Sequence, residues 1–324
     1  MTHLPALTRR ALLAAPALVP AAASAQAFPA RTLRIISPSA PGGVTDTVGR
    51  LLAERLAPAL GVAVVVENRP GAAGTLATDA TARAAPDGHT LLLAADSLIV
   101  VNPFVYPNAA SNPLTDLVPV APVATAPYVL AVHPSVPARS LPEFVAVARS
   151  AANPLPYGSG GVGGLQHLGM EMLMRRAGFP MLHVPYRSGS GASLALVAGE
   201  VAAMMGGGSL APLLREGRVR ALATTGPARM AALPEVPTVA ETYPGFSLQF
   251  WLGLFAPLGV PHDTLTLLRA EVTAAIAEAG MRQALLRGAE LVPLDPSLTG
   301  FEALIGEDAE RFRRMIEELG IRPA

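Results

Sequence analysis

One stretch of this chain constrains the fold more than any other. A short apolar segment, residues 33–36, runs directly into Ser37-Pro38-Ser39-Ala40-Pro41-Gly42-Gly43, and an amphipathic segment follows at 45–60. A strand that ends in such a loop and opens a helix leaves backbone N–H groups unpaired, and the helix dipole adds about half a positive charge there. Thr45 is the predicted N-cap, and Asp46 is an acid in the first turn. The pattern predicts a βα unit whose loop binds an anion.

Short apolar segments alternate with amphipathic ones along the rest of the chain, which predicts βαβ units and a mostly parallel sheet. The length of 324 residues suits about two domains. Strands are expected at 33–36, 62–67, 90–94, 128–132, 181–184, 201–205, 220–224 and 251–256. Helices are expected at 45–60, 75–84, 141–151 with Ser140 as its cap, 166–177, 192–199, 263–279, 280–287 and 298–319.

Residues 1–25 are predicted to be an export signal peptide. Arg9 and Arg10 precede an apolar run at 11–22, and Ala23-Ser24-Ala25 fits an A-x-A cleavage site. A transmembrane anchor is the alternative, although the run is short for a span and two prolines interrupt it. The chain has no cysteine, which excludes disulfides, thiol chemistry and a lipid anchor on cysteine. We therefore expect a protein of the periplasm.

The charged residues exclude several classes of partner and cofactor. Basic and acidic residues both number 24, so the formal net charge is zero. No basic block is present, and a nucleic-acid partner is not expected. Lysine does not occur, which rules out a P-loop lysine and a Schiff-base lysine. We expect no cofactor.

Three segments together resemble a known family. They are the proline–glycine loop above, Glu67-Asn68-Arg69-Pro70-Gly71, and Ala85-Pro86-Asp87-Gly88-His89-Thr90-Leu91-Leu92-Leu93. The chain resembles the periplasmic solute receptors of tripartite tricarboxylate transporters, the Bug receptor family. The resemblance implies an α/β fold with two lobes of the type II periplasmic-binding-protein kind, a ligand cleft between the lobes and closure by hinge motion.

Two apolar strands are candidate crossovers between such lobes. They are predicted at 128–132, ending at His133-Pro134, and at 251–256, ending at Ala256-Pro257. Two crossovers make one lobe an insertion within the other. The lobes would then comprise 28–127 plus 251–324, and 128–250. A single large sheet is the alternative that the sequence alone leaves open.

A second glycine loop, Gly158-Ser159-Gly160-Gly161-Val162-Gly163-Gly164, formally matches a dinucleotide fingerprint. No acidic residue follows at the distance needed to hold a ribose, so that interpretation is weak. The resemblance implies that this loop faces the first one across the cleft. Ser159, Gly160 and Gly163 would then offer N–H and hydroxyl groups to a ligand; the alternative is a glycine loop needed only for a tight turn.

The predicted ligand-binding residues come from four segments. The first loop contributes Ser39, Ala40, Gly42, Gly43 and Thr45, with Gly43 expected to lie against the ligand. The second loop contributes the three residues just named. Val184-Pro185-Tyr186-Arg187-Ser188-Gly189 resembles a family segment with Lys in place of Arg187, and Arg187 offers a carboxylate a bidentate fork. Ser188 is a candidate contact or a helix cap.

Asp96 and Ser97 stand where many relatives carry Gly-Ser-Thr, and they complete the predicted site. An Asp96 that lines the cleft would repel a second carboxylate and favour an amine, guanidine or hydroxyl. The alternative is an Asp96 that faces solvent or caps the following turn through Ser97. The family's usual Met-Phe-Asp-Asn is Met204-Met205-Gly206-Gly207 here, so the ligand is expected to differ from simple di- and tricarboxylates.

No catalytic or metal-binding constellation is evident. Trp251 is interpreted as a core residue of its strand, with a cleft wall as the alternative. The remaining histidines outside the signal are isolated in the sequence and show no metal-ligand spacing; they are His89, His133, His167, His183 and His262.

The sequence therefore predicts a monomeric periplasmic receptor that binds a small organic acid and delivers it to membrane permease subunits. Two other functions stay open. One is a sensory ligand-binding subunit for a membrane kinase. The other is a hydrolase or isomerase that uses Asp96 or a histidine of the cleft.

Overall fold

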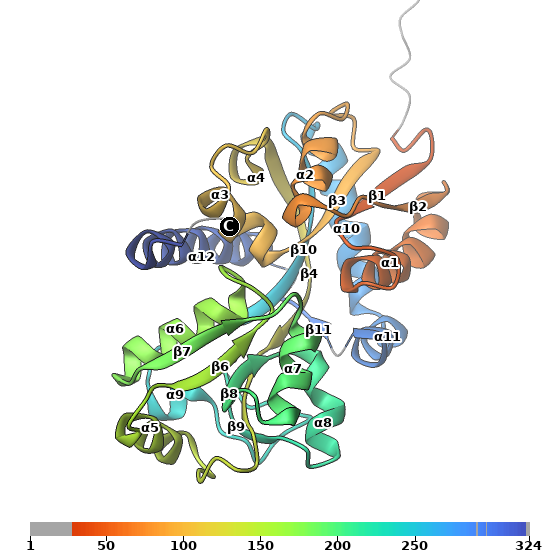
Figure 1. Cartoon of the computed structure of the whole chain (residues 1–324). Coiled ribbons are helices and arrows are strands. Elements are labelled where there is room, and N and C mark those ends of the chain that lie inside the picture. Colours follow the sequence, from red (N-terminus) through yellow and green to blue (C-terminus); the bar gives the residue numbers. More distant parts are fainter. Residues whose placement is uncertain (1–27, 290, 296, 322–324) are drawn as a thin grey trace, which may run out of the picture.

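The computed structural model describes residues 28–289, 291–295 and 297–321. The predicted signal peptide, 1–25, lies outside the described residues. The strands form two sheets, one above the other in Figure 1, in the orders β11-β4-β10-β3-β1-β2 and β7-β6-β8-β5-β9. We call each sheet with its covering helices the first and second lobe.

The elements alternate as the sequence predicts, and most predicted ends lie within three residues of those observed. The strands are β1 (Leu33–Ser37), β2 (Val64–Asn68), β3 (Thr90–Ala95), β4 (Leu117–Pro127), β5 (Val129–Val132), β6 (Leu155–Ser159), β7 (Met181–Pro185), β8 (Ala203–Gly206), β9 (Arg220–Thr224), β10 (Gln249–Pro257) and β11 (Val292–Pro293). The longer helices are α1 (Val44–Leu60), α2 (Thr75–Ala82), α5 (Leu141–Ser150), α6 (Leu165–Ala177), α7 (Gly189–Ala198), α10 (His262–Ala277), α11 (Ala279–Ala289) and α12 (Leu298–Leu319). The short helices are η1 (Ala72–Gly74), η2 (Ser97–Val101), α3 (Asn102–Val105), α4 (Pro113–Asp116), η3 (Gly208–Leu210), α8 (Ala211–Arg215) and α9 (Val239–Thr242).

The first sheet is covered by helices on both faces. Strands β1, β2 and β3 are parallel, with β10 antiparallel to β3 and β4 antiparallel to β10. Because successive side chains of a strand point to opposite faces, Ile35 belongs to the core under α1, α10 and α11, whereas Ile36 belongs to the core under α2, η2 and α12. Burial on both faces explains the continuous apolar runs of these strands.

The second sheet repeats this layering. Strand β6 is parallel to β7 and β8, and β5 is antiparallel to β8 and β9. Helices α5 and α6 cover one face and share a core cluster with the first lobe, whereas α7 covers the other face. Ser140 caps α5, as predicted, and its Oγ accepts from Glu143 N at 3.3 Å.

The chain crosses between the sheets twice. Strand β4 lies in the first sheet and β5 lies wholly in the second, and only Tyr128 separates the two strands, so the first crossing lies at the start of the strand predicted at 128–132. The return occurs between β9 and β10, before the strand predicted at 251–256. The single-sheet alternative is excluded by the two sheets.

Strand β4 was not predicted because its sequence, LVPVAPVATAP, contains three prolines. Proline cannot donate to a ladder and normally argues against a central strand. Here the register against β10 shifts beside Pro119 and Pro122, so that Val120 and Val123 are skipped. Such bulges accommodate the missing donors and keep the strand paired.

Gly253 of β10 gives a test of this packing. A Cβ at this position would lie 2.3 Å from Cζ of the buried Phe301. We expect Gly253→Ala to lower the free energy of unfolding by about 1–3 kcal/mol, because the tightly packed ring has to move. Urea unfolding measures this; Gly306→Ala on α12, where a Cβ meets nothing within 4 Å, is the control and should not destabilise. An unchanged stability of Gly253→Ala would contradict the packing described.

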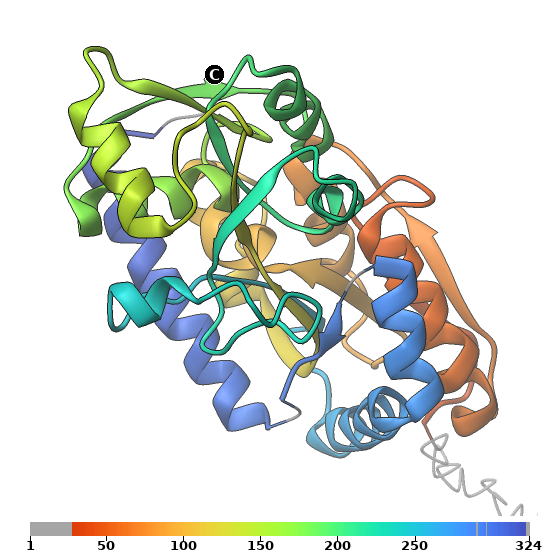
Figure 2. The ribbon, with the colours of Figure 1, turned by 90° about the horizontal axis from the view of Figure 1, so that it is seen from below.

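Helix α12 belongs to the first lobe but lies along the junction of the two lobes (Figures 1 and 2). It packs against η2 and β4 of the first lobe. Arg175 on α6 of the second lobe forms an ion pair with Glu318 near its end. Within the described residues, no helix is long and apolar enough to span a bilayer.

Candidate functional site

The carboxyl ends of the parallel strands carry the loops that the sequence singled out. Ser37 at the end of β1 is in register with Asn68 of β2, and Ser159 at the end of β6 is in register with Pro185 of β7. In open α/β sheets the crevice beyond these ends is where ligands bind. We call residues 38–43, between β1 and α1, loop A, and residues 160–164, between β6 and α6, loop B.

Loop A ends in a glycine N-cap. Gly43 caps α1 with φ −72° and ψ 167° and no side-chain hydrogen bond, so the predicted cap at Thr45 is wrong. Thr45 is instead buried, and its Oγ1 lies 2.7 Å from Ser37 Oγ and 2.6 Å from Ser39 Oγ. A hydroxyl held by Ser37 at the end of β1 and by Ser39 in loop A is not free to cap the helix.

Asp46 holds loop A in place. Its Oδ2 accepts from Gly42 N at 2.9 Å and from Arg50 Nε at 3.1 Å, and its Oδ1 accepts from Asn68 Nδ2 at 2.9 Å. The hydrogen bond from Arg50, helped by those from Gly42 and Asn68, lowers the pKa of Asp46 from 3.8 to about 2. Asp46 therefore acts on the loop as a carboxylate at every pH that a cell compartment reaches.

Loop B has nearly the same geometry as loop A. Gly164 caps α6 with φ −68° and ψ 157°, again without a side-chain hydrogen bond. The preceding glycines match as well, with φ +81° at Gly42 and +79° at Gly163. His167 takes the place of Asp46, since its Nδ1 accepts from Gly163 N at 3.1 Å. Helix α1 in the first lobe and helix α6 in the second thus both begin without a side-chain cap.

The polar groups predicted to contact a ligand from loop B are already bonded within the protein. Ser159 is buried, and its Oγ donates to Gly161 O at 3.0 Å and lies 2.6 Å from His183 Nε2. Gly160 N donates to Gln166 Oε1 at 2.7 Å, and Gly163 N donates to His167. These bonds correct the prediction that Ser159, Gly160 and Gly163 offer these groups to a ligand.

The backbone N–H groups of Gly42 and Gly43 in loop A are likewise already hydrogen-bonded within the protein. Gly42 N donates to Asp46, and Gly43 N donates to Ala40 O at 3.0 Å. A Cβ on Gly43 would lie 2.5 Å from Ser39 Cβ, so Gly43 is required by the loop itself and not by a ligand alone. The groups left without an acceptor, within the described chain, include the N–H groups of the first helical turns: Val44, Thr45, Leu165 and Gln166.

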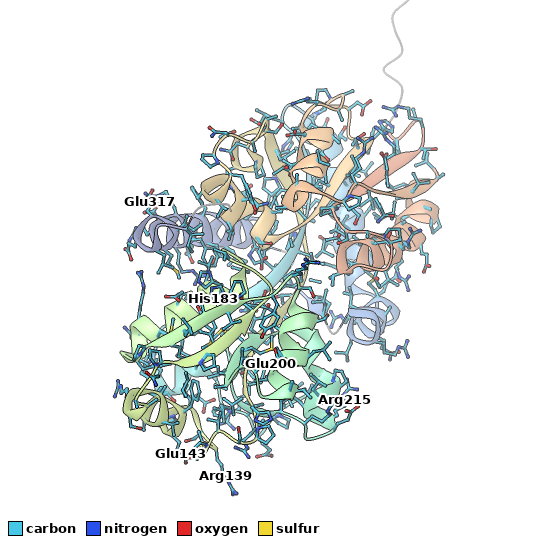
Figure 3. The ribbon with its side chains drawn as sticks, viewed as in Figure 1. Arg139, Glu143, His183, Glu200, Arg215 and Glu317 are labelled. Atoms are coloured by element: carbon cyan, nitrogen blue, oxygen red, sulfur yellow. The ribbon has the colours of Figure 1, made fainter. Side chains whose placement is uncertain are left out.

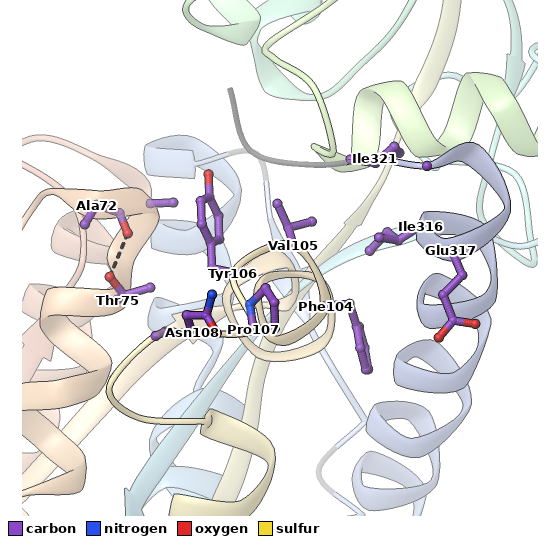
Figure 4. Close-up of a pocket in the computed structure, with 13 residues that line it drawn as sticks. Ala72, Thr75, Phe104, Val105, Tyr106, Pro107, Asn108, Ile316, Glu317 and Ile321 are labelled. Carbon is purple, nitrogen blue, oxygen red and sulfur yellow. Dashed lines mark hydrogen bonds between the residues drawn. The ribbon is translucent and has the colours of Figure 1, made fainter.

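A groove of about 960 Å³ opens in the first lobe, next to loop B. Figure 4 shows it between Thr75 at the start of α2, Tyr106 after α3 and Ile316 on α12. It borders both lobes: a Cβ on Gly163 of loop B would lie 3.5 Å from methyl groups of the lining residues Val105 and Ile321. Its thirteen lining residues include none of the twelve predicted site residues; they are Ala72, Ala73, Thr75, Phe104, Val105, Tyr106, Pro107, Asn108, Ala109, Ile316, Glu317, Gly320 and Ile321.

Comparison with known proteins decides the family. The model for the tripartite tricarboxylate transporter family receptor matches residues 48–321. This chain belongs to that receptor family. The resemblance drawn from three sequence segments is thereby confirmed.

Three relatives match this receptor over about nine tenths of its length or more. BugT of Bordetella pertussis is 33% identical over 308 residues, which cover 94% of each chain. A Rhodopseudomonas palustris protein solved with adipate has a TM-score of 0.78 at 29% identity, with 92% of this chain and 100% of that chain covered. MatC of Rhodopseudomonas palustris, solved with bound malate, has a TM-score of 0.73 at 33% identity, with 89% and 100% covered. The predicted two-lobed binding-protein fold is confirmed.

Asp96 of this receptor is a structural residue and does not face a ligand. It is buried, and its Oδ2 accepts from Trp251 N at 3.0 Å while its Oδ1 accepts from Ser97 N at 2.5 Å. Burial raises its pKa well above the usual range. The hypothesis that Asp96 selects an amine in the ligand is wrong. The alternative, in which the Asp96 side chain caps the following turn through Ser97 N, is confirmed. Ser97 is half-buried in the first turn of η2.

Trp251 lies in the core, as the favoured interpretation had it. Its side chain is buried, and its Nε1 donates to Asp308 Oδ2 on α12 at 3.0 Å. The contact ties β10, which enters the first sheet directly after the second crossing, to α12.

Arg187 and Ser188 lie in the loop between β7 and α7. Ser188 caps α7, and its Oγ accepts from Gly191 N at 3.1 Å. The side chain of Arg187 is exposed and makes no hydrogen bond or ion pair with the described part of the chain. Of the predicted side chains, Arg187 is the one whose charge is fully available to a ligand.

Sequence reasoning missed a pair of histidines. His167 and His183 were interpreted as isolated, but their rings stack with centroids 3.9 Å apart and planes 7° apart. Figure 3 shows His183 on the side of the second lobe nearest the first lobe. A repeated pattern in the sequence could have revealed His167. The pattern is Gly-Gly-x-x-Asp/His, and it occurs as Gly42-Gly43-Val44-Thr45-Asp46 and as Gly163-Gly164-Leu165-Gln166-His167. Within the described residues, no third metal-ligating side chain joins the pair.

Proposed function

We propose that this chain is a periplasmic receptor that binds a small organic acid between its lobes and delivers it to membrane permease subunits. In this proposal residues 1–25 are removed on export. The lobes comprise 28–127 plus 251–324, and 128–250. The receptor acts as a monomer and catalyses no reaction.

One observation carries the proposal: each lobe presents a helix N-terminus capped by glycine, in nearly the same backbone conformation, at the carboxyl end of a parallel strand. Uncapped first-turn N–H groups and the helix dipole favour an anion. An acid whose carboxylate spans the two helix ends therefore gains contacts from both lobes, which favours the closed arrangement.

The class of ligand follows from the receptor family and from the available charge. The relatives solved with adipate and malate are bound to dicarboxylic acids. A second carboxylate on the ligand of this chain would find Arg187, whose guanidinium has no partner within the described protein. We therefore propose a dicarboxylic or larger acid, with one carboxylate at the helix ends and the other at Arg187. This replaces the expectation of a ligand unlike simple di- and tricarboxylates, because the buried Asp96 does not face a ligand.

Titration calorimetry with adipate and malate tests the proposal, with 1,6-hexanediol as the uncharged counterpart of adipate. Binding of an acid with a dissociation constant near micromolar corresponds to about 8 kcal/mol and would support it. If the diol released or absorbed heat on titration and neither acid did, the result would contradict the proposal. A wider panel of carboxylates in a thermal-shift assay precedes the titration, so that the acid titrated is one that the chain retains.

Arg187→Gln separates the role of the second carboxylate. We expect it to weaken binding of a dicarboxylate about tenfold or more, because a charge-assisted pair is lost, and to change that of the matching monocarboxylate by less than twofold. Arg139→Gln is the control, since this exposed arginine lies at the far end of the second lobe (Figure 3). Equal losses for both acids would place Arg187 outside the site.

A further inference from the structure

Asp46 is the third residue of α1, and His167 is the third residue of α6. Each accepts a hydrogen bond from a glycine of the preceding loop, but one is an acid and the other an imidazole. Asp46 Oδ2 accepts from Gly42 N at 2.9 Å in loop A, and His167 Nδ1 accepts from Gly163 N at 3.1 Å in loop B. We propose that neutral His167, supported by His183, is the positioning residue of loop B, and that protonation of His167 releases the loop. The link to ligand capture rests on the proposed function; the link to loop geometry does not.

The contact with Gly163 fixes the protonation state of His167. Since the backbone N–H is a donor, Nδ1 must carry a lone pair, and the ring hydrogen of the neutral imidazole is on Nε2. Nε2 lies 3.8 Å from Glu171 Oε1, which is too long for a direct hydrogen bond. A proton added to Nδ1 turns the acceptor into a second donor, so the bond to Gly163 is lost.

His183 connects the same ring stack to the start of loop B. Its Nε2 lies 2.6 Å from Ser159 Oγ, and that hydroxyl donates to Gly161 O at 3.0 Å. When Ser159 gives its one hydroxyl hydrogen to Gly161 O, His183 donates its Nε2 hydrogen to Ser159. Imidazoles therefore contact both ends of the loop, one from α6 and one from β7.

The acidic groups nearest the pair already have other partners. Tyr157 of β6 stacks on His183 with centroids 4.9 Å apart, and its hydroxyl donates to Glu171 Oε1 at 2.8 Å. Glu171 is thus the nearest acid, and it is already engaged. The next charged pair, Arg175 with Glu318 of α12, is further along α6. Two rings stacked at 3.9 Å repel each other strongly if both are protonated.

Burial, and next the neighbouring His183, lowers the pKa of His167 from 6.5 to about 4; burial also lowers the pKa of His183. An opened loop takes up a proton near pH 6.5, whereas the closed loop resists it to about pH 4. The closed form is therefore most favoured above pH 6.5 and loses its advantage as the pH falls towards 4. Asp46, with a pKa of about 2, keeps loop A closed over the whole of this range.

Hydrogen exchange of the unliganded mature chain tests the proposal without any ligand. The variants are His167→Asn, whose Oδ1 can accept from Gly163 N but cannot take a proton, and His167→Leu, which has no acceptor. His262→Asn, an exposed position at the start of α10, is the control. Comparing variants at the same pH cancels the intrinsic dependence of exchange on pH.

We expect protection of residues 160–164 in the wild type to fall at least tenfold relative to His167→Asn between pH 7.5 and 4.5. Residues 42–46 and the His262→Asn control should show no such difference. His167→Leu should be unprotected in loop B at both pH values. Equal protection of wild type and His167→Asn at both pH values would overturn the proposal, and that comparison stands even if His167→Leu does not fold.

Titration of the acid found by calorimetry then tests the link to capture. We expect its affinity for the wild type to fall at least tenfold over the same pH interval, and its affinity for His167→Asn to fall less than threefold. Equal losses would overturn the link. A chain that binds no acid at any pH but shows the exchange pattern would refute the proposed function alone.

Discussion

Asp46→Ala is expected to destabilise loop A and abolish acid binding. The substitution removes the acceptor for Gly42 N, Asn68 Nδ2 and Arg50 Nε, and so removes three hydrogen bonds to one carboxylate. Hydrogen bonds to a charged group are worth about 1.5–3 kcal/mol each, and the exposed Arg50 will recover part of that in water. We expect a net loss of about 2–3 kcal/mol in the free energy of unfolding, measured in urea at pH 7.

Two further variants show whether the effect of Asp46→Ala is specific to this carboxylate. Asp263→Ala removes an exposed first-turn acid from α10 and should change neither stability nor affinity appreciably. Asp46→Asn keeps one acceptor for Gly42 and should fall between wild type and alanine. Full acid binding by Asp46→Ala would show that loop A does not need this carboxylate.

The same residue predicts the response of stability to acid. Because the pKa of Asp46 is lowered in the folded protein from 3.8 to about 2, its contribution is complete above pH 3.8 and is lost as the pH falls through 2. The difference in stability between wild type and Asp46→Asn should be constant from pH 7 to 4 and shrink below that.

Gly43→Ala is expected to have the second largest effect, at least a tenfold loss of affinity for the acid. The new Cβ would lie 2.5 Å from Ser39 Cβ and 3.1 Å from Ala40 O. Neither atom is the free end of a flexible side chain, so the backbone of loop A has to shift and the first turn of α1 shifts with it. The cost in stability should be about 1–3 kcal/mol.

Gly61→Ala at the other end of α1 separates affinity from stability. Gly61 has φ +69°, and a Cβ at this position would meet nothing within 4 Å. Alanine there therefore costs about 1–2 kcal/mol of backbone strain without touching the loop. Calorimetry should show its affinity unchanged within twofold. If Gly43→Ala binds as tightly as Gly61→Ala, loop A is not part of the site.

The sequence predicted the loops well because their chemistry is local. Glycine and proline after an apolar strand leave few backbone choices, so both glycine loops lie where they were expected. Helix α12 agrees with the predicted 298–319 to the residue because its apolar spacing is regular. Strand β4 was missed because its prolines argue against a strand, and only its partner β10 shows where the register shifts.

The details of the site depend on contacts that no local pattern specifies. Asp96 accepts from Trp251, 155 positions away, so its burial cannot be read from its neighbours. The stack of His167 on His183 depends on how α6 lies on β6 and β7. By contrast, the repeated Gly-Gly-x-x-Asp/His pattern is visible in the sequence, and it predicts that Asp46 and His167 occupy equivalent places.

The central claim is that an acid bridges the first turns of α1 and α6. The most direct measurement is hydrogen exchange of the mature chain with and without a saturating acid from the calorimetric panel. We predict that residues 44–46 and 165–167 both gain protection. Protection confined to the groove residues 104–109 and 316–321, with neither helix start affected, would contradict the claim.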